Sequence, residues 1–148
     1  MSDNISIYKI QLVKENMPSK YNTRINSPEC CANLARDFMK QYNDREVFIL
    51  VCLSTKNTIA GINLVSMGSI NSSIVHPREV YKPAILANSA RIIVAHNHPS
   101  GDLEPSKEDI ALTKRLYEAG EIIGVELLDH LIIGEGDDYL SMKAKNLF

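Results

Sequence analysis

Hydrophobic residues along this chain occur in blocks, several of which have the composition of buried strands. Largely apolar runs at 46–54 and 91–95 predict two strands, the first central in a sheet and the second fully buried. A further run at 58–67 predicts a third strand, and the turn Thr55-Lys56-Asn57 joins it to the first as a hairpin. Strands of this kind need helices to cover them, so the spacing between the runs decides the fold class.

Helical spacing is found between these runs. Over 27–43 a serine cap and a proline precede apolar residues that recur every three to four positions, which predicts a helix. A second helix is expected over 77–88, where Pro83 should kink it or split it in two. A third should open at Pro105-Ser106 and stop at Gly120.

The two ends of the chain complete the predicted arrangement. Alternating apolar residues over 5–13 predict an N-terminal strand, and the region 122–133 predicts a last strand, followed by a short turn near Ser141. We divide the chain into an N-terminal strand and linker, 1–26, and one domain, 27–148. The order of elements predicts an α/β fold with a mixed β-sheet flanked by helices.

The richest candidate chemistry lies in the second half of the chain. His96 and His98 stand two apart at the end of the strand 91–95, so their side chains point to the same side. A turn and a helix start then bring Asp109 back toward them. Two imidazoles and one carboxylate leave a fourth position for water, as in catalytic zinc sites. Asn97 points to the opposite side and is expected to form hydrogen bonds rather than bind metal.

Each of these residues also has a structural explanation. Ser106 and Asp109 have the spacing of a helix capping box, and capping is compatible with metal binding because a capped side chain is a rigid ligand. His96 and His98 could instead be surface residues of a turn. Asp102 is interpreted as a loop charge, as is Glu104.

The remaining two histidines are kept out of the predicted metal sphere. His76 lies at or near the start of the second helix, either as a partly exposed loop residue or as a residue near the site. His130 follows Asp129 in the last strand, and we interpret these two as a satisfied, partly buried pair.

The combined spacing resembles the JAB/MPN metallopeptidase (JAMM) motif, a distant Glu, then His-x-His, ten residues and Asp, with Ser three before the Asp. The wider wording resembles the RadC branch of that family, on the sequences His96-Asn97-His98-Pro99-Ser100-Gly101-Asp102, Pro105-Ser106-Lys107-Glu108-Asp109 and Leu128-Asp129-His130. The resemblance covers roughly Ser27 to the C-terminus. It implies the JAB/MPN fold, which is similar to that of cytidine deaminases.

The resemblance also implies a set of catalytic roles. Glu46 stands where the family has its glutamate, at the head of an early strand after the first helix, although a solvated charge at a strand start is the alternative. Zinc held by His96, His98 and Asp109 would make hydroxide available from its bound water. Glu46 would take the proton and deliver it to the leaving amine, and Ser106 would donate a hydrogen bond to the oxyanion.

Composition indicates a small intracellular enzyme. With 148 residues, of which 45% are hydrophobic, the chain can bury one core. Its three cysteines suggest neither a disulfide framework nor a thiolate zinc site, and the Pro-Cys-x-x-Cys half-site of zinc deaminases is missing. The longest apolar run is the seven residues Val47 to Leu53, too short to span a membrane, and the polar start lacks signal-peptide features, so the cytoplasm is the expected location.

Charge bears on partners. The formal net charge is −2 and the cations are scattered, so no nucleic-acid partner is expected for this chain. Full-length RadC-like proteins usually carry an N-terminal helix-hairpin-helix region, which residues 1–26 do not resemble. We expect a zinc-dependent metallopeptidase or isopeptidase-like hydrolase acting on a peptide or protein, with no membrane partner. A noncatalytic metal-stabilised scaffold and a DNA-repair-associated accessory protein are the alternatives.

Overall fold

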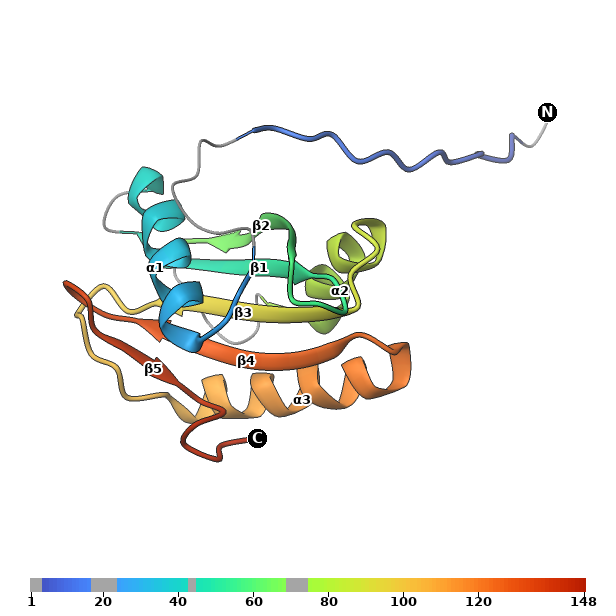
Figure 1. The fold of residues 1–148 in the computed structure, drawn as a ribbon. Coiled ribbons are helices and arrows are strands. Elements are labelled where there is room, and N and C mark those ends of the chain that lie inside the picture. The colour runs from blue at the N-terminus through green and yellow to red at the C-terminus, as the bar shows by residue number, and fades with distance from the viewer. Residues whose placement is uncertain (1–3, 17–23, 43–44, 69–74) are drawn as a thin grey trace.

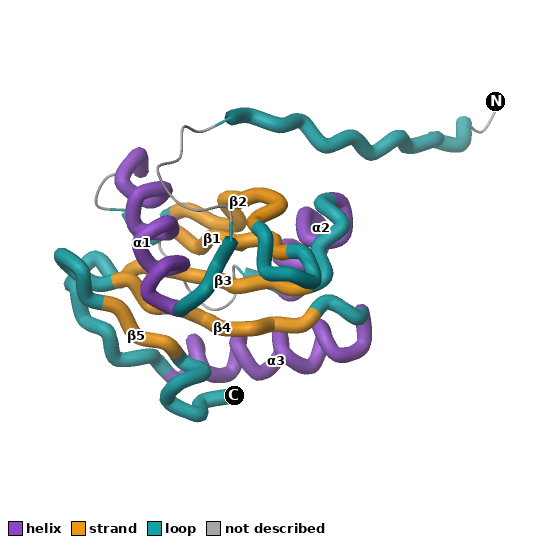
Figure 2. The backbone as a smooth tube through the Cα atoms, in the orientation of Figure 1, coloured by secondary structure: helices purple, strands orange, loops and turns teal. Residues whose placement is uncertain are grey.

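A computed structural model describes residues 4–16, 24–42, 45–68 and 75–148 of the chain. It shows the expected α/β architecture, with a single mixed sheet lying between helices (Figures 1 and 2). No helix in these ranges combines the length and apolar character needed to cross a membrane.

The sheet has five strands in the order β2-β1-β3-β4-β5. β3 and β4 are parallel, and every other neighbouring pair is antiparallel. Parallel neighbours need a crossover connection, which the helix α3 provides here. The strand bounds are β1 Val47–Leu53, β2 Ile59–Met67, β3 Arg91–Asn97, β4 Glu126–Ile133 and β5 Tyr139–Ser141.

The helices begin where the capping signals predict. α1 spans Pro28–Met39 and continues as a 3₁₀ turn, Lys40–Tyr42, and the Ser27 hydroxyl caps it by accepting from Cys30 N at 3.2 Å. α2 spans Pro77–Leu86 and is not split in two by its internal proline. α3 spans Lys107–Ile123.

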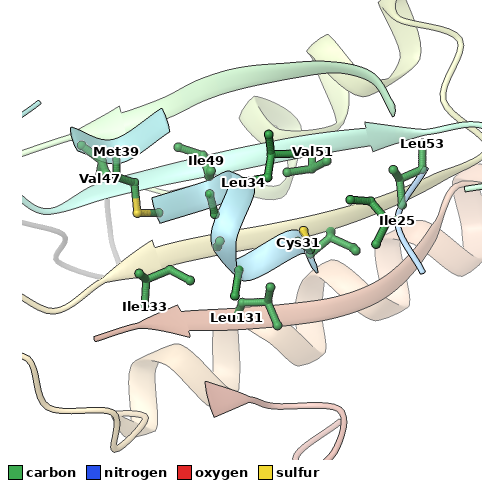
Figure 3. Close-up of a cluster of buried hydrophobic side chains, with 14 residues drawn as sticks. Ile25, Cys31, Leu34, Met39, Val47, Ile49, Val51, Leu53, Leu131 and Ile133 are labelled. Atoms are coloured by element: carbon green, nitrogen blue, oxygen red, sulfur yellow. The ribbon is translucent and has the colours of Figure 1, made fainter. Parts of the chain in front are cut away.

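Side chains of β1 alternate between two hydrophobic clusters and fix the layers. Val47, Ile49, Val51 and Leu53 pack against α1 on one face, as Figure 3 shows. The residues between them face the opposite cluster, which includes side chains of α2 and α3. All seven residues of β1 are buried and the strand lies between β2 and β3, which confirms the prediction of a central strand.

The C-terminal end of α3 differs from the sequence prediction. Gly120 lies inside the helix rather than at its end. A Cβ at this position would stand 2.4 Å from the Val125 carbonyl and 2.5 Å from the Tyr81 hydroxyl, so only glycine fits. The absence of a side chain at Gly120 therefore lets Tyr81 and Val125 approach the helix closely, and it does not end the helix. Gly124 ends the helix with a left-handed φ of 85°, and the last long strand begins at residue 126 rather than 122.

The two ends of the chain were also predicted incompletely. Residues 4–16 form no strand, since a strand exists only where its backbone pairs with a neighbour, and no described strand pairs with them. Near Ser141 the expected turn is preceded by a short strand, β5, which pairs with Leu131–Ile133. Three residues of alternating pattern are too few to show a strand in the sequence.

Candidate metal centre

The three predicted metal ligands meet where β3 ends and α3 begins. Nε2 of His96 and Nε2 of His98 are 3.0 Å apart, and carboxylate oxygens of Asp109 lie 3.5 and 3.4 Å from them. Ligand atoms of a tetrahedral zinc site stand about 3.3 Å apart when the metal bonds are about 2.0–2.1 Å. The separations therefore fit a zinc ion, and the group could hold a metal.

Local structure fixes the outer two ligands. Asp109 is the N3 residue of α3, where its Oδ2 accepts from Ser106 N at 2.9 Å and its own N donates to Ser106 Oγ at 3.0 Å, a complete capping box. His98 lies one residue beyond β3, and its Nδ1 is 2.6 Å from the carbonyl of Asp102. A carbonyl can only accept, so Nδ1 carries the proton and Nε2 is left to face the other ligands.

His96 is held by a buried chain of polar contacts behind the site. Its Nδ1 lies 2.7 Å from Nε2 of His130, whose Nδ1 lies 2.6 Å from the hydroxyl of Thr113. That hydroxyl is 2.6 Å from the backbone carbonyl of Asp109, to which it donates. These contacts therefore connect the side chain of His96 to the backbone of Asp109, which is another predicted ligand.

One placement of protons gives every contact in this chain a donor. His96 donates from Nδ1 to His130, which donates from its own Nδ1 to Thr113, which donates to Asp109. Nε2 of His96 is then bare, like Nε2 of His98, and two lone pairs face each other across 3.0 Å. A metal ion could accept both lone pairs, and metal-bound histidines generally donate their second N–H in this manner.

Electrostatics agree with neutral imidazole behind the ligands. Burial lowers the pKa of His130 well below its ordinary value, and the neighbouring charge of His96 lowers it further. For Asp109 burial acts to raise the pKa. When His96 is protonated, as it can be without a metal, its hydrogen bond and charge, together with the bonds from Ser106, outweigh burial and hold the pKa of Asp109 below its usual range. A neutral imidazole behind the site and an ionised carboxylate within it are the forms that metal binding requires.

The Asp129-His130 pair is arranged differently from expectation. Both residues are buried and hydrogen-bonded, as predicted, but their side chains have separate partners. Asp129 accepts from its neighbour's backbone N at 2.8 Å and from the Ser141 hydroxyl at 2.6 Å. Adjacent residues of a strand point to opposite faces, so only His130 reaches the metal centre.

Thr113 was missed in the sequence. It follows Asp109 by four positions, and residues at that spacing share a face of a helix. A polar residue one turn after a predicted ligand was the available signal. This signal was weak, because the importance of Thr113 depends on its contact with His130 of β4.

Phe48 of β1 contacts two histidines of the site, and Glu46 precedes this strand. The ring of Phe48 stacks on His96 at a centroid distance of 6.0 Å and meets His130 edge-on at 5.5 Å. Glu46 is half-buried just before β1 and two residues before Phe48, so strand alternation directs its side chain to the same face. The predicted base thus precedes a residue that contacts a ligand.

Asn97 is the hydrogen-bonding residue that the sequence predicts. Its Oδ1 accepts from Val47 N at 2.8 Å, and its Nδ2 donates to the carbonyl of Arg45 at 2.9 Å. These are the two neighbours of Glu46. Asn97, which lies between the two histidines in the sequence, therefore holds the backbone in place on both sides of Glu46.

Other predicted polar residues lie outside the ligand group. His76 is the half-buried N-cap of α2, and its side chain makes no capping bond. Asp102 supplies the carbonyl behind His98, while its carboxylate accepts from Glu104 N at 3.0 Å. Both acids are exposed, as expected of loop charges.

The part of the chain that contains these residues is similar to known proteins. The profile of the RadC-like JAB domain matches residues 25–147. A UPF0758 protein of Moorella thermoacetica is 56% identical over 125 residues, which are 84% of this chain and 54% of that protein. UPF0758 proteins of Clostridium acetobutylicum, 51% identical over 126 residues (85% and 54%), and Desulforamulus reducens, 48% identical over 131 residues (88% and 57%), are also similar.

The chain spans about half the length of these relatives, so the match concerns their shared domain. Its extent includes the strand β3, the turn after it and the helix α3, which carry the predicted ligands. The five-stranded mixed sheet flanked by helices agrees with the JAB/MPN fold. The chain belongs to the RadC-like JAB domain family.

Proposed function

We propose that this domain is a zinc-dependent hydrolase that cleaves an amide or isopeptide bond of a peptide or protein substrate. The observation that carries the proposal is the convergence of two bare imidazole nitrogens and one carboxylate at tetrahedral spacing. Three protein ligands leave a coordination position for water, which separates a catalytic site from a closed structural one. The family match supports the choice of hydrolase.

Bound zinc would polarise water and stabilise negative charge on a substrate oxygen. Its ligands are His96, His98 and Asp109. Glu46 acts as the general base that takes a proton from water and later delivers it to the leaving nitrogen. The hydrogen bonds of Asn97 with the backbone of Val47 and Arg45 support this role, because they fix the chain on both sides of Glu46.

Ser106 would act as an oxyanion donor in addition to capping α3. Its Oγ accepts from Asp109 N, a bond that uses a lone pair and leaves the O–H able to donate. The residue is exposed and caps the helix that carries Asp109. Donation of that hydrogen to a developing oxyanion is worth on the order of 3 kcal/mol in related settings.

The test separates metal binding from catalysis. Zinc-loaded wild-type protein is screened against an internally quenched peptide library and isopeptide-linked substrates, and the best substrate is used with Glu46→Gln. Zinc content should stay near the wild-type level, while the rate should fall by about 10² or more because the proton acceptor is gone. The matched control is Glu104→Gln, which makes the same change on an exposed loop nearby.

Two results would contradict the assignment of Glu46. Loss of zinc in Glu46→Gln would make this residue a ligand, and an unchanged rate would place the base elsewhere.

Ser106→Gly tests the oxyanion role, since glycine retains most of the capping preference while removing the donor. Cleavage by wild type that is equal with and without bound zinc would sink the proposal as a whole.

A further inference from the structure

The strands β1 and β3 stop pairing with each other beside the metal centre. They are antiparallel neighbours in the sheet (Figure 1), and Phe48 opposite His96 is their last pair at this end. In the same register, Glu46 would stand opposite His98 if both strands continued. β3 ends at Asn97 instead, and His98 lies beyond the strand with its Nε2 3.0 Å from that of His96.

The end of β3 leaves two backbone groups before β1 without a strand partner. Successive residues of a strand direct their backbone groups to opposite neighbours. The carbonyl of Glu46 is directed to β2, where it accepts from Gly68 N at 2.9 Å, so the carbonyl of Arg45 and the N–H of Val47 face β3. In the register of the two strands Arg45 would stand opposite Pro99, which has no N–H to donate.

The side-chain carboxamide of Asn97 takes the place of the missing peptide group. Its Oδ1 accepts from Val47 N at 2.8 Å, and its Nδ2 donates to the carbonyl of Arg45 at 2.9 Å. A carboxamide has the same donor and acceptor groups as a peptide bond, so it can continue the ladder where β3 leaves it. With the bond from Gly68, three hydrogen bonds hold the backbone around Glu46.

We propose that Asn97 is a positioning residue for Glu46, an inference that rests on the proposed function, in which Glu46 is the general base. Asn97 lies between the two histidine ligands, so one residue relates the position of the base to the position of the metal. A base must lie within hydrogen-bond reach of the water that it deprotonates. A displacement of about 1 Å can lower the rate by about 10²-fold.

The two histidine ligands are oriented by other contacts. Nδ1 of His96 lies against His130, and Nδ1 of His98 donates to the carbonyl of Asp102. Neither contact involves the side chain of Asn97. Loss of the carboxamide should therefore reduce the rate while it leaves zinc affinity near the wild-type value, a separation that a residue supporting only the metal site would not produce.

A double-mutant cycle on the full, zinc-loaded chain tests this role with the internally quenched peptide that is cleaved best. Asn97→Ala should lower kcat by about 10-fold to 10²-fold with little change in KM. In the Glu46→Gln background the same substitution should lower kcat by less than about 2-fold, because no base remains to be positioned. Asn33→Ala, on α1 at the opposite face of the sheet, is the matched control and should keep wild-type kinetics.

Zinc affinity, measured by competition with a fluorescent chelator, separates positioning from metal binding. Asn97→Ala should not show the loss of about 10–100-fold that follows when a ligand loses its partner. An equal loss of kcat in both backgrounds, wild-type kinetics in Asn97→Ala, or a fall in zinc affinity that matches the fall in rate would overturn the proposal. A wild-type chain without zinc-dependent cleavage would instead contradict the proposed function.

Hydrogen exchange tests the structural part of the proposal without any substrate. In Asn97→Ala the amides of Val47 and Gly68 should exchange at least about 10-fold faster than in wild type, while that of Val51, in the middle of β1, should be unchanged. Asn97→Ser should behave in the same way, because its short hydroxyl cannot bridge both backbone groups, and it replaces the alanine variant if that variant does not fold. A Val47 amide that stays fully protected in either variant would show that the backbone is held without Asn97, and would overturn the proposal.

Discussion

His130 places its Nε2 2.7 Å from Nδ1 of His96, on the side of that imidazole turned away from the other ligands. A histidine rather than a carboxylate or a carbonyl thus orients the buried ligand. His130 is itself fully buried and aligned by Thr113. The pair links the position of the metal-facing nitrogen to the packing between β4 and α3.

This relationship predicts that His130 controls metal affinity without touching the metal. His130→Leu should lower zinc affinity by about 10–100-fold, because His96 loses the partner that fixes its ring and tautomer. Competition with a fluorescent chelator measures the change. His76→Leu is the matched control, and equal affinities in the two variants would show that the contact has no influence on the site.

Thr113 should matter for stability through its hydroxyl rather than its shape. Thr113→Val keeps the volume but leaves His130 and the Asp109 carbonyl without their shared partner, so the free energy of unfolding should fall by about 1–3 kcal/mol. Thr113→Ser should restore most of that loss. Urea unfolding of the metal-free proteins provides the comparison, and a valine variant as stable as wild type would remove the polar chain from the account.

Local signals were sufficient for the elements that carry the ligands. The serine-proline start of α1, the continuous apolar run of β1 and the capping box of α3 each occupy a few adjacent residues, so their chemistry can be read from the sequence. His96, His98 and Asp109 depend on only one strand, one turn and one helix start. Their meeting point follows from that short connection.

Features that depend on distant neighbours were not predictable. His130 reaches His96 because β4 pairs in parallel with β3, with Val94 opposite His130, and this register is set across the crossover helix. Gly120 was expected to stop α3, but its role is set by Tyr81 on another helix. The strand expected over 5–13 lacks a described partner, since pattern alone cannot supply an edge to pair with.

The pH dependence of stability should report the buried histidine. Its pKa is lowered in the folded state, by burial first and by His96 next, so below about pH 6.5 the unfolded chain binds a proton that the folded chain does not. Stability of the metal-free protein should therefore decline as the pH falls below this value. The decline should be steeper than in His130→Leu by up to about 1.4 kcal/mol per pH unit.

Urea titrations of the two metal-free proteins at pH 7.5, 6.5 and 5.5 provide the measurement. Asp109, whose pKa is held low, loses its stabilising contribution only in stronger acid and is common to both proteins. Parallel stability curves would mean that His130 titrates in the folded state much as it does in the unfolded chain.

The most direct test of the metal centre is the zinc content and zinc affinity of the purified chain. Wild type and His76→Ala should each retain about one zinc per molecule after dialysis against a weak chelator, because three converging ligands remain. His98→Ala should retain none, since two ligands seldom hold zinc under such competition. Stoichiometric, tightly bound zinc in a His96→Ala/His98→Ala double variant would contradict the account, because the metal would then be held by other residues.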